Sequence, residues 1–168
     1  MRTEADLFRP ENLPLLSEER KLASEYNKII GSQTIHWDGE ELTLQQMRKL
    51  LHSLERASRE RLWRLAAERQ LADRQPINQL WQRFLTLRSN LAKNAGLPDY
   101  RQYRWRQMLR LDYSPDDCLR FQDAIEQVAV PAASRVYEKH RRRLGVRQLR
   151  PWDLDQELYP LELPPLPS

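Results

Sequence analysis

Residues 114–145, SPDDCLRFQDAIEQVAVPAASRVYEKHRRRLG, hold the clearest helix signals in the chain. Ser114 can cap a helix, and the proline and two aspartates that follow suit its first turn and positive end. Gly145 suits the other end, since many helices close on a glycine. Pro131 lies between them, where it removes one backbone hydrogen bond and crowds the preceding turn. The stretch therefore predicts one long Pro-kinked helix near 115–145.

Apolar residues recur along this helix at steps of three and four. That spacing places them on one face, which we expect to be the packed face. Cys118 belongs to this stripe, and a small buried core residue is favoured over a thiol activated by the nearby helix N-terminus. The stripe consists of Cys118, Phe121, Ile125, Val128, Ala132 and Val136.

Further helices are predicted on the N-terminal side of this one. Their inward positions follow the same spacing, and glycines stand at or just after two of their ends. The predicted ranges are 18–31, 43–53, 56–73, 76–95 and 99–111, with Leu22, Tyr26, Ile29, Leu62, Leu65, Ala66, Ile77, Leu80, Phe84, Leu87, Leu91 and Ala95 pointing inward.

A short alternating stretch interrupts the helices at residues 33–44. Asp38-Gly39 is a two-residue turn favoured between antiparallel strands. We therefore predict a β-hairpin whose apolar residues, Ile35, Trp37, Leu42 and Leu44, pack on a helix, because two strands alone are marginally stable.

The fold class is accordingly mainly α: a multi-helix array with one short β-hairpin near 33–44 and the long kinked helix. We expect an N-terminal arm at 1–17 and a helical domain with the hairpin at 18–147. The five prolines of residues 148–168 predict an extended Pro-rich C-terminal segment.

The amino-acid composition limits which classes of partner and which cellular compartment we expect. The net charge is +4 from 28 basic and 24 acidic residues, so acids nearly balance an Arg-rich chain and a nucleic-acid partner is not favoured. Cys118 is the only cysteine, which excludes an internal disulfide and a thiolate cluster. With acidic residues near Met1 and no apolar run of about 20 residues, we expect a cytoplasmic chain without a membrane partner.

The polar candidates do not form a known catalytic or metal motif. His36, His52 and His140 lack the H-E-x-x-H spacing, and we expect one strand residue and two solvated helix residues. Asp153, Asp155 and Glu157 alternate like part of a calcium loop without its glycine, and a solvated tail is favoured. We therefore predict no catalytic, cofactor-binding or metal residue.

Several arginine-rich positions can be interpreted in more than one way. The interleaved aromatics and arginines of 100–110 suit base stacking or amphipathic packing equally well. The run 139–143 suits the negative end of the helix dipole. Arg88 borders an apolar stripe, where it either snorkels to solvent or meets a carboxylate from elsewhere.

An ordered set of short runs resembles the oligoendopeptidase F group of zinc oligopeptidases, relatives of thimet oligopeptidase. It extends from about Arg20 to Asp155 and matches helix caps, the Pro kink and a Pro-Trp-Asp run together. The runs are Glu40–Leu44, Arg59–Arg61, Arg88 with Leu91-Ala92, Ala95–Leu97, Tyr100, Tyr103, Arg110–Asp117, Val130-Pro131, Leu144-Gly145 and Leu149–Asp153.

The resemblance implies a mostly helical enzyme with a deep channel that cuts short peptides. It implies zinc held by an H-E-x-x-H segment, whose glutamate acts as general base, and a downstream glutamate. That segment would follow everything matched here, so no catalytic or metal residue is carried over, and we expect an inert scaffold portion. Its expected partner is the catalytic portion or a second copy. The alternatives are a stand-alone helical peptide- or protein-binding module and an Arg-rich RNA-binding protein.

Overall fold

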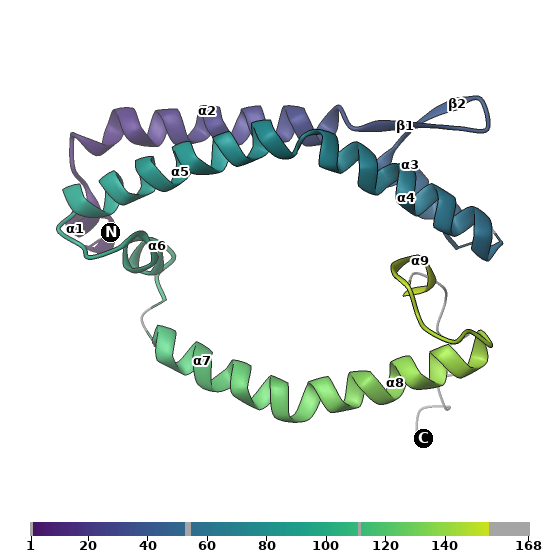
Figure 1. The fold of residues 1–168 in the computed structure, drawn as a ribbon. Helices are drawn as coiled ribbons and strands as arrows, with labels where there is room; N and C mark the ends of the chain where they lie inside the picture. The colour runs from purple at the N-terminus through teal and green to yellow at the C-terminus, as the bar shows by residue number, and fades with distance from the viewer. Residues whose placement is uncertain (1, 53–54, 111, 155–168) are drawn as a thin grey trace, which may run out of the picture. The chain divides into compact units, whose positions relative to one another are not determined.

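A computed structural model describes residues 2–52, 55–110 and 112–154 (Figure 1). The predicted mainly-α class with one hairpin and one long helix is confirmed. In chain order the elements are α1 Arg2–Leu7, α2 Asn12–Gly31, β1 Thr34–Trp37, β2 Glu40–Thr43, α3 Leu44–Leu50, α4 Arg56–Ala72, α5 Arg74–Asn94, α6 Tyr100–Gln107, α7 Pro115–Ala124, the π-helical turn η1 Ile125–Ala129, α8 Val130–Arg143 and α9 Pro151–Leu154. No helix among these residues is long and apolar enough to cross a bilayer.

The chain divides into two compact units. The first comprises residues 1–32 and 71–123, and the second comprises 33–70 and 124–168. The predicted arm, helical domain and C-terminal segment stay a prediction, and most of that last segment lies outside the described residues.

The first unit is built on the packing of α2 against α5 (Figure 1). The predicted inward spacing of α5 is confirmed, because the side chains at steps of three and four are the buried ones. One cluster joins Leu22 of α2 to Leu80, Phe84, Leu87 and Leu91 of α5. A second cluster joins Leu7, Ala92, Ala95 and Tyr103, and so ties α1 and α6 to the end of α5.

The start of α2 differs from the prediction. The helix begins at Asn12, upstream of Ser17, and a short α1 precedes it. Pro14 is tolerated because the first helical turn needs no N–H from that position. Tyr26, predicted to point inward, is 36% exposed, since α2 meets α5 through Leu22 and the half-buried Ile29 instead.

The second unit contains the hairpin, whose predicted turn is confirmed. Ile35 pairs with Leu42 and Trp37 with Glu40 across the two strands. Asp38 and Gly39 both have positive φ, 50° and 85°, as the favoured two-residue hairpin turn requires. The hairpin packs with α3 and α4 in a cluster of Ile35, Trp37, Met47, Leu51, Leu62 and Ala66.

The long helix carries a π-helical turn beside its proline. The N–H of Val130 donates to the carbonyl of Ile125, five residues back, so one extra residue enters the turn just before Pro131. The prediction that its apolar stripe is packed is wrong. No residue of α7 or η1 is buried, and Phe121 and Val128 are 67% and 72% exposed. Apolar spacing therefore identifies a face suited to packing, but it does not identify what packs against that face.

Candidate functional site

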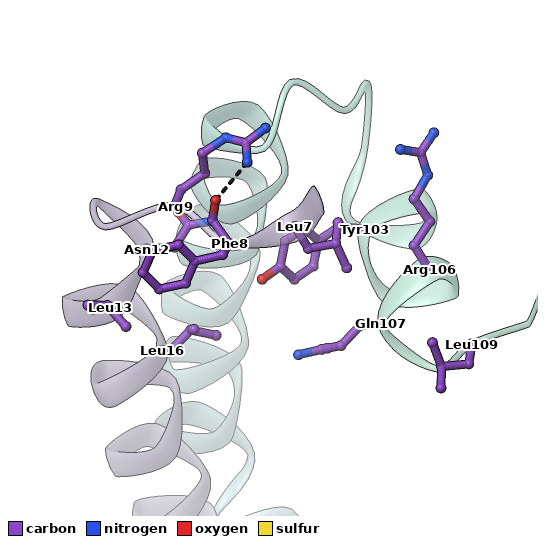
Figure 2. Close-up of a pocket in the computed structure, with 10 residues that line it drawn as sticks. All are labelled: Leu7, Phe8, Arg9, Asn12, Leu13, Leu16, Tyr103, Arg106, Gln107 and Leu109. Carbon is purple, nitrogen blue, oxygen red and sulfur yellow. Dashed lines mark hydrogen bonds between the residues drawn. The ribbon is translucent and has the colours of Figure 1, made fainter. Parts of the chain in front are cut away.

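A pocket of about 190 Å³ opens in the first unit (Figure 2). Its walls come from α1, the following turn, the start of α2 and the end of α6. Most of its lining is apolar, and its polar groups come from two arginines, an asparagine, a glutamine and a tyrosine. The lining residues are Leu7, Phe8, Arg9, Asn12, Leu13, Leu16, Tyr103, Arg106, Gln107 and Leu109.

Buried residues hold the inner wall of this pocket in place. The Asn12 amide donates to the carbonyl of Leu91 at 3.1 Å and accepts from the Asn94 amide at 2.9 Å. Leu7 and Tyr103 are likewise buried. Burial raises the pKa of Tyr103, and the charge of Glu19 adds to the effect, so the phenol stays neutral at ordinary pH. The inner wall is therefore pre-formed.

The outer edge of the pocket is exposed and cationic. The guanidinium of Arg106 has no partner among the described residues, whereas Arg9 donates from Nη1 to the carbonyls of Phe8 and Asp6. Both guanidinium groups reach toward the same side of the pocket in Figure 2. Leu109 lines the pocket away from these guanidinium groups in Figure 2, and its φ of +54° is a left-handed conformation that branched side chains seldom adopt.

Arg88 meets a carboxylate, which confirms one of its two predicted interpretations. Its Nε donates to Glu19 of α2 at 2.8 Å, and the Tyr100 hydroxyl donates to the same oxygen at 3.1 Å. The guanidinium carbon lies 4.5 Å from the ring centre of Phe84 and 5.1 Å from that of Tyr100. Burial, followed by the charge of Glu19, raises the pKa of Tyr100. The cluster joins α2, α5 and α6.

Asp153 is the principal correction to the predicted polar residues. Instead of lying in a solvated tail, it is fully buried in α9, and its carboxylate accepts two hydrogen bonds from Arg56. Burial alone raises its pKa, but the hydrogen bonds from Arg56 and the Arg150 N–H, with the charges of Arg56 and Arg59, lower it overall. The other two acids of this predicted group, Asp155 and Glu157, lie outside the described residues.

His140 was predicted to be solvated, and this is wrong. It is 3% exposed, and its Nε2 lies 2.8 Å from the carbonyl oxygen of Asp153. Nε2 must therefore carry the proton. His36 and His52 are exposed, and His52 lies in the turn after α3 rather than in a helix. The long-range contact of His140 has no sequence signal, because its partner is a backbone carbonyl.

The structure also tests the predictions for Cys118 and for the two cationic stretches. Cys118 is half-buried rather than part of the core. In the run 139–143, Arg141 donates to the carbonyl of Val146 beyond the helix end, consistent with the dipole interpretation. In the stretch 100–110, Tyr103 packs inward as amphipathic packing requires, while Arg110 stacks 4.8 Å from the Trp105 ring centre.

The described residues do not fit a zinc site. They contain no group of three or more His, Cys, Asp or Glu side chains that could hold a metal ion. His140, the buried histidine, directs its Nε2 to the backbone carbonyl of Asp153. No catalytic step is therefore assigned to these residues.

Comparison with solved structures gives similar folds over nearly the whole chain. A 3.1 Å X-ray structure of a protein assigned as oligoendopeptidase F has a TM-score of 0.88 at 27% identity, over 92% of this chain and 27% of its own. PZ peptidase A with an inhibitor has a TM-score of 0.88 at 26% identity, over 92% and 28%. A protein assigned as oligoendopeptidase F from Bacillus anthracis str. Ames, at 22% identity, shares the fold with a TM-score of 0.87 over 93% and 29%.

The chain thus spans less than a third of the length of these relatives. None of the curated proteins matches it. The sequence model of peptidase family M3 matches residues 49–164, which include α4 to α9 and the contact between Arg56 and Asp153. The chain belongs to peptidase family M3.

Proposed function

We propose that these residues form a scaffold portion of a zinc oligopeptidase that hydrolyses short peptides. The observation that carries the proposal is the match to family M3 over 49–164, together with solved structures that contain this fold as 27–28% of their chains. Family M3 is zinc-dependent in general, and the catalytic metal would be held by residues outside the described part of this chain.

The exposed stripe of the long helix supports a scaffold role. Phe121 and Val128 are more than half exposed on a helix whose apolar spacing favours a packed face. In the proposed enzyme this face packs against the catalytic portion and helps to form one wall of a substrate channel. The 168 residues by themselves are then inert.

Complementation tests this proposal. The 168-residue chain is assayed with zinc on quenched-fluorescent peptides, alone and after mixing with a separately produced H-E-x-x-H portion of an oligoendopeptidase F. We expect no hydrolysis from the chain alone and more hydrolysis from the mixture than from the H-E-x-x-H portion alone. Zinc-dependent hydrolysis by the chain alone, or no gain on mixing, would contradict it.

The second candidate is a stand-alone helical module that binds peptide or protein, favoured by the pre-formed pocket in the first unit. A monodisperse chain that binds peptide without gaining activity on mixing would support this alternative. For either function, Cys118 as the one cysteine of the 168 residues supports a proposed location in the reducing cytoplasm.

A further inference from the structure

The pocket in the first unit combines an apolar interior with an unpaired cation. We propose that it binds the C-terminal residue of a peptide, with a bulky apolar side chain inside and the free carboxylate at Arg106 and Arg9. The proposed peptidase role explains only where such peptides come from. The site itself stands on the pocket's own volume, charge and backbone conformation.

The volume fits one large side chain. A cavity of about 150 Å³ lined by aliphatic and aromatic groups is enough to hold benzene. The pocket's 190 Å³ therefore holds a phenyl or isobutyl group, and Leu7, Leu13 and Leu16 supply the apolar contacts. Because Asn12 and Tyr103 are already fixed, little ordering is required on binding.

The charge at the edge of the pocket fits an anion. Arg106 has no acidic partner among the described residues, and Arg9 is engaged only by backbone carbonyls. The 20-residue helix α2 begins at Asn12 in the pocket wall, so the positive end of its dipole faces the same region. The nearby acids Asp6 and Glu11 do not line the pocket. A carboxylate is the complementary group that every peptide carries at its C-terminus.

The backbone at Leu109 is a separate indication. The N–H of Leu109 donates to the carbonyl of Arg106, and that of Arg110 donates to Trp105, so α6 closes in a motif where glycine is usual. Leucine in this conformation is strained, and its side chain is 57% exposed at the pocket edge. An exposed leucine held there supplies an apolar contact to a bound residue.

Titration of the 168-residue chain with N-acetyl-phenylalanine, followed by amide NMR shifts of the pocket residues, tests the inference. N-acetyl-phenylalaninamide removes the carboxylate, and N-acetyl-alanine removes the large side chain. We expect the amide to bind about five-fold more weakly and the alanine compound at least roughly ten-fold more weakly.

Two variants assign the contacts. Arg106→Gln is expected to lower the affinity for N-acetyl-phenylalanine about five-fold and to leave the affinity for the amide unchanged. Arg101→Gln, which makes the same charge change on α6 outside the pocket, is the matched control and should change neither. Leu109→Gly should lower the affinity for both phenylalanine compounds. It should not unfold the chain, since glycine adopts this backbone conformation freely.

The inference would be overturned if N-acetyl-phenylalanine bound no more tightly than its amide or than N-acetyl-alanine. It would also be overturned if Arg106→Gln and Arg101→Gln changed the affinity equally. So would shifts of the same resonances when the protein concentration rises without ligand, which would place a second copy in the pocket. Because the readout is binding to the chain alone, failure of the peptidase proposal leaves this test intact.

Discussion

Arg56 and Asp153, 97 residues apart, form a two-point ion pair in which Nε–Oδ1 and Nη2–Oδ2 are both 3.0 Å. Arg59, one helical turn further along α4, places Nη2 3.6 Å from the same carboxylate and donates from Nε to the Trp152 carbonyl at 3.0 Å. The pair therefore fixes α9 to α4 within the second unit. Since Asp153 is fully buried, its carboxylate depends on these partners.

Asp153→Asn should destabilise the second unit strongly. The substitution keeps the side-chain shape but removes the buried negative charge that Arg56 and Arg59 both face. Removing one member of a buried pair is expensive, and because Arg56 remains partly exposed we expect a loss of about 2–3 kcal/mol in the free energy of unfolding. Urea denaturation followed by tryptophan fluorescence measures it, because Trp63 and Trp152 lie 5.6 Å apart in this unit.

Glu60→Gln is the matched control for this loss. It also removes an acid from an arginine on α4, but the Glu60–Arg64 pair is exposed and spans one helical turn. We expect less than about 0.5 kcal/mol. Comparable losses from the two variants would show that burial of Asp153 adds nothing.

The carboxylate of Asp153 also makes the free energy of unfolding depend on pH in the acid range. The folded pKa of Asp153 lies below its ordinary value of 3.8, so the unfolded state binds its proton more readily. Its stabilisation is therefore present above that ordinary value and is lost as the pH falls through the lower, folded pKa. Glu138, held to a pKa of about 2 by hydrogen bonds from Arg141 and Arg142, acts in the same direction.

Urea midpoints measured at several pH values on both sides of the ordinary aspartate pKa check this dependence. We expect the wild-type midpoint to fall on the acid side and the Asp153→Asn midpoint to fall less steeply. Parallel curves for the two proteins would remove Asp153 as the source.

Features formed by residues close together in the sequence could be predicted, whereas contacts between residues distant in the sequence could not. The Asp38-Gly39 turn and the buried spacing of α5 both arise within a few residues, and each is confirmed. Arg56 and Arg59 share one face of α4 and meet a common anion. Nothing local identified that anion as Asp153, because the pair forms only when distant segments fold together.

Arg88→Lys should destabilise the first unit although it keeps the charge. The planar guanidinium both donates to Glu19 and stacks on Phe84 and Tyr100, and an ammonium reproduces neither geometry. We expect a loss of about 1 kcal/mol in the free energy of unfolding, measured by urea denaturation.

Arg83→Lys provides the comparison on the same helix. Arg83 also reaches α2, where it pairs with Glu18 and Glu25, but all three side chains are partly exposed and no aromatic ring of a described residue stacks on the guanidinium. Its expected effect is within about 0.5 kcal/mol. If the two variants behave alike, the aromatic contacts of Arg88 contribute no measurable stability.

Val128→Asp should reduce self-association of the isolated chain. Val128 is 72% exposed on the stripe of the long helix, and contiguous exposed apolar surface favours association. Light scattering after gel filtration, over a range of loading concentrations, should give a larger mass for the wild type at high concentration than for the variant. Gln127→Asp introduces the same charge at the adjacent exposed position, off the stripe, and should leave the mass close to wild type. Equal masses for the two variants would mean that charge, rather than the apolar stripe, controls association. A wild-type chain that stays monomeric throughout would mean that the stripe does not bind a second copy, leaving the catalytic portion of the proposed enzyme as its partner.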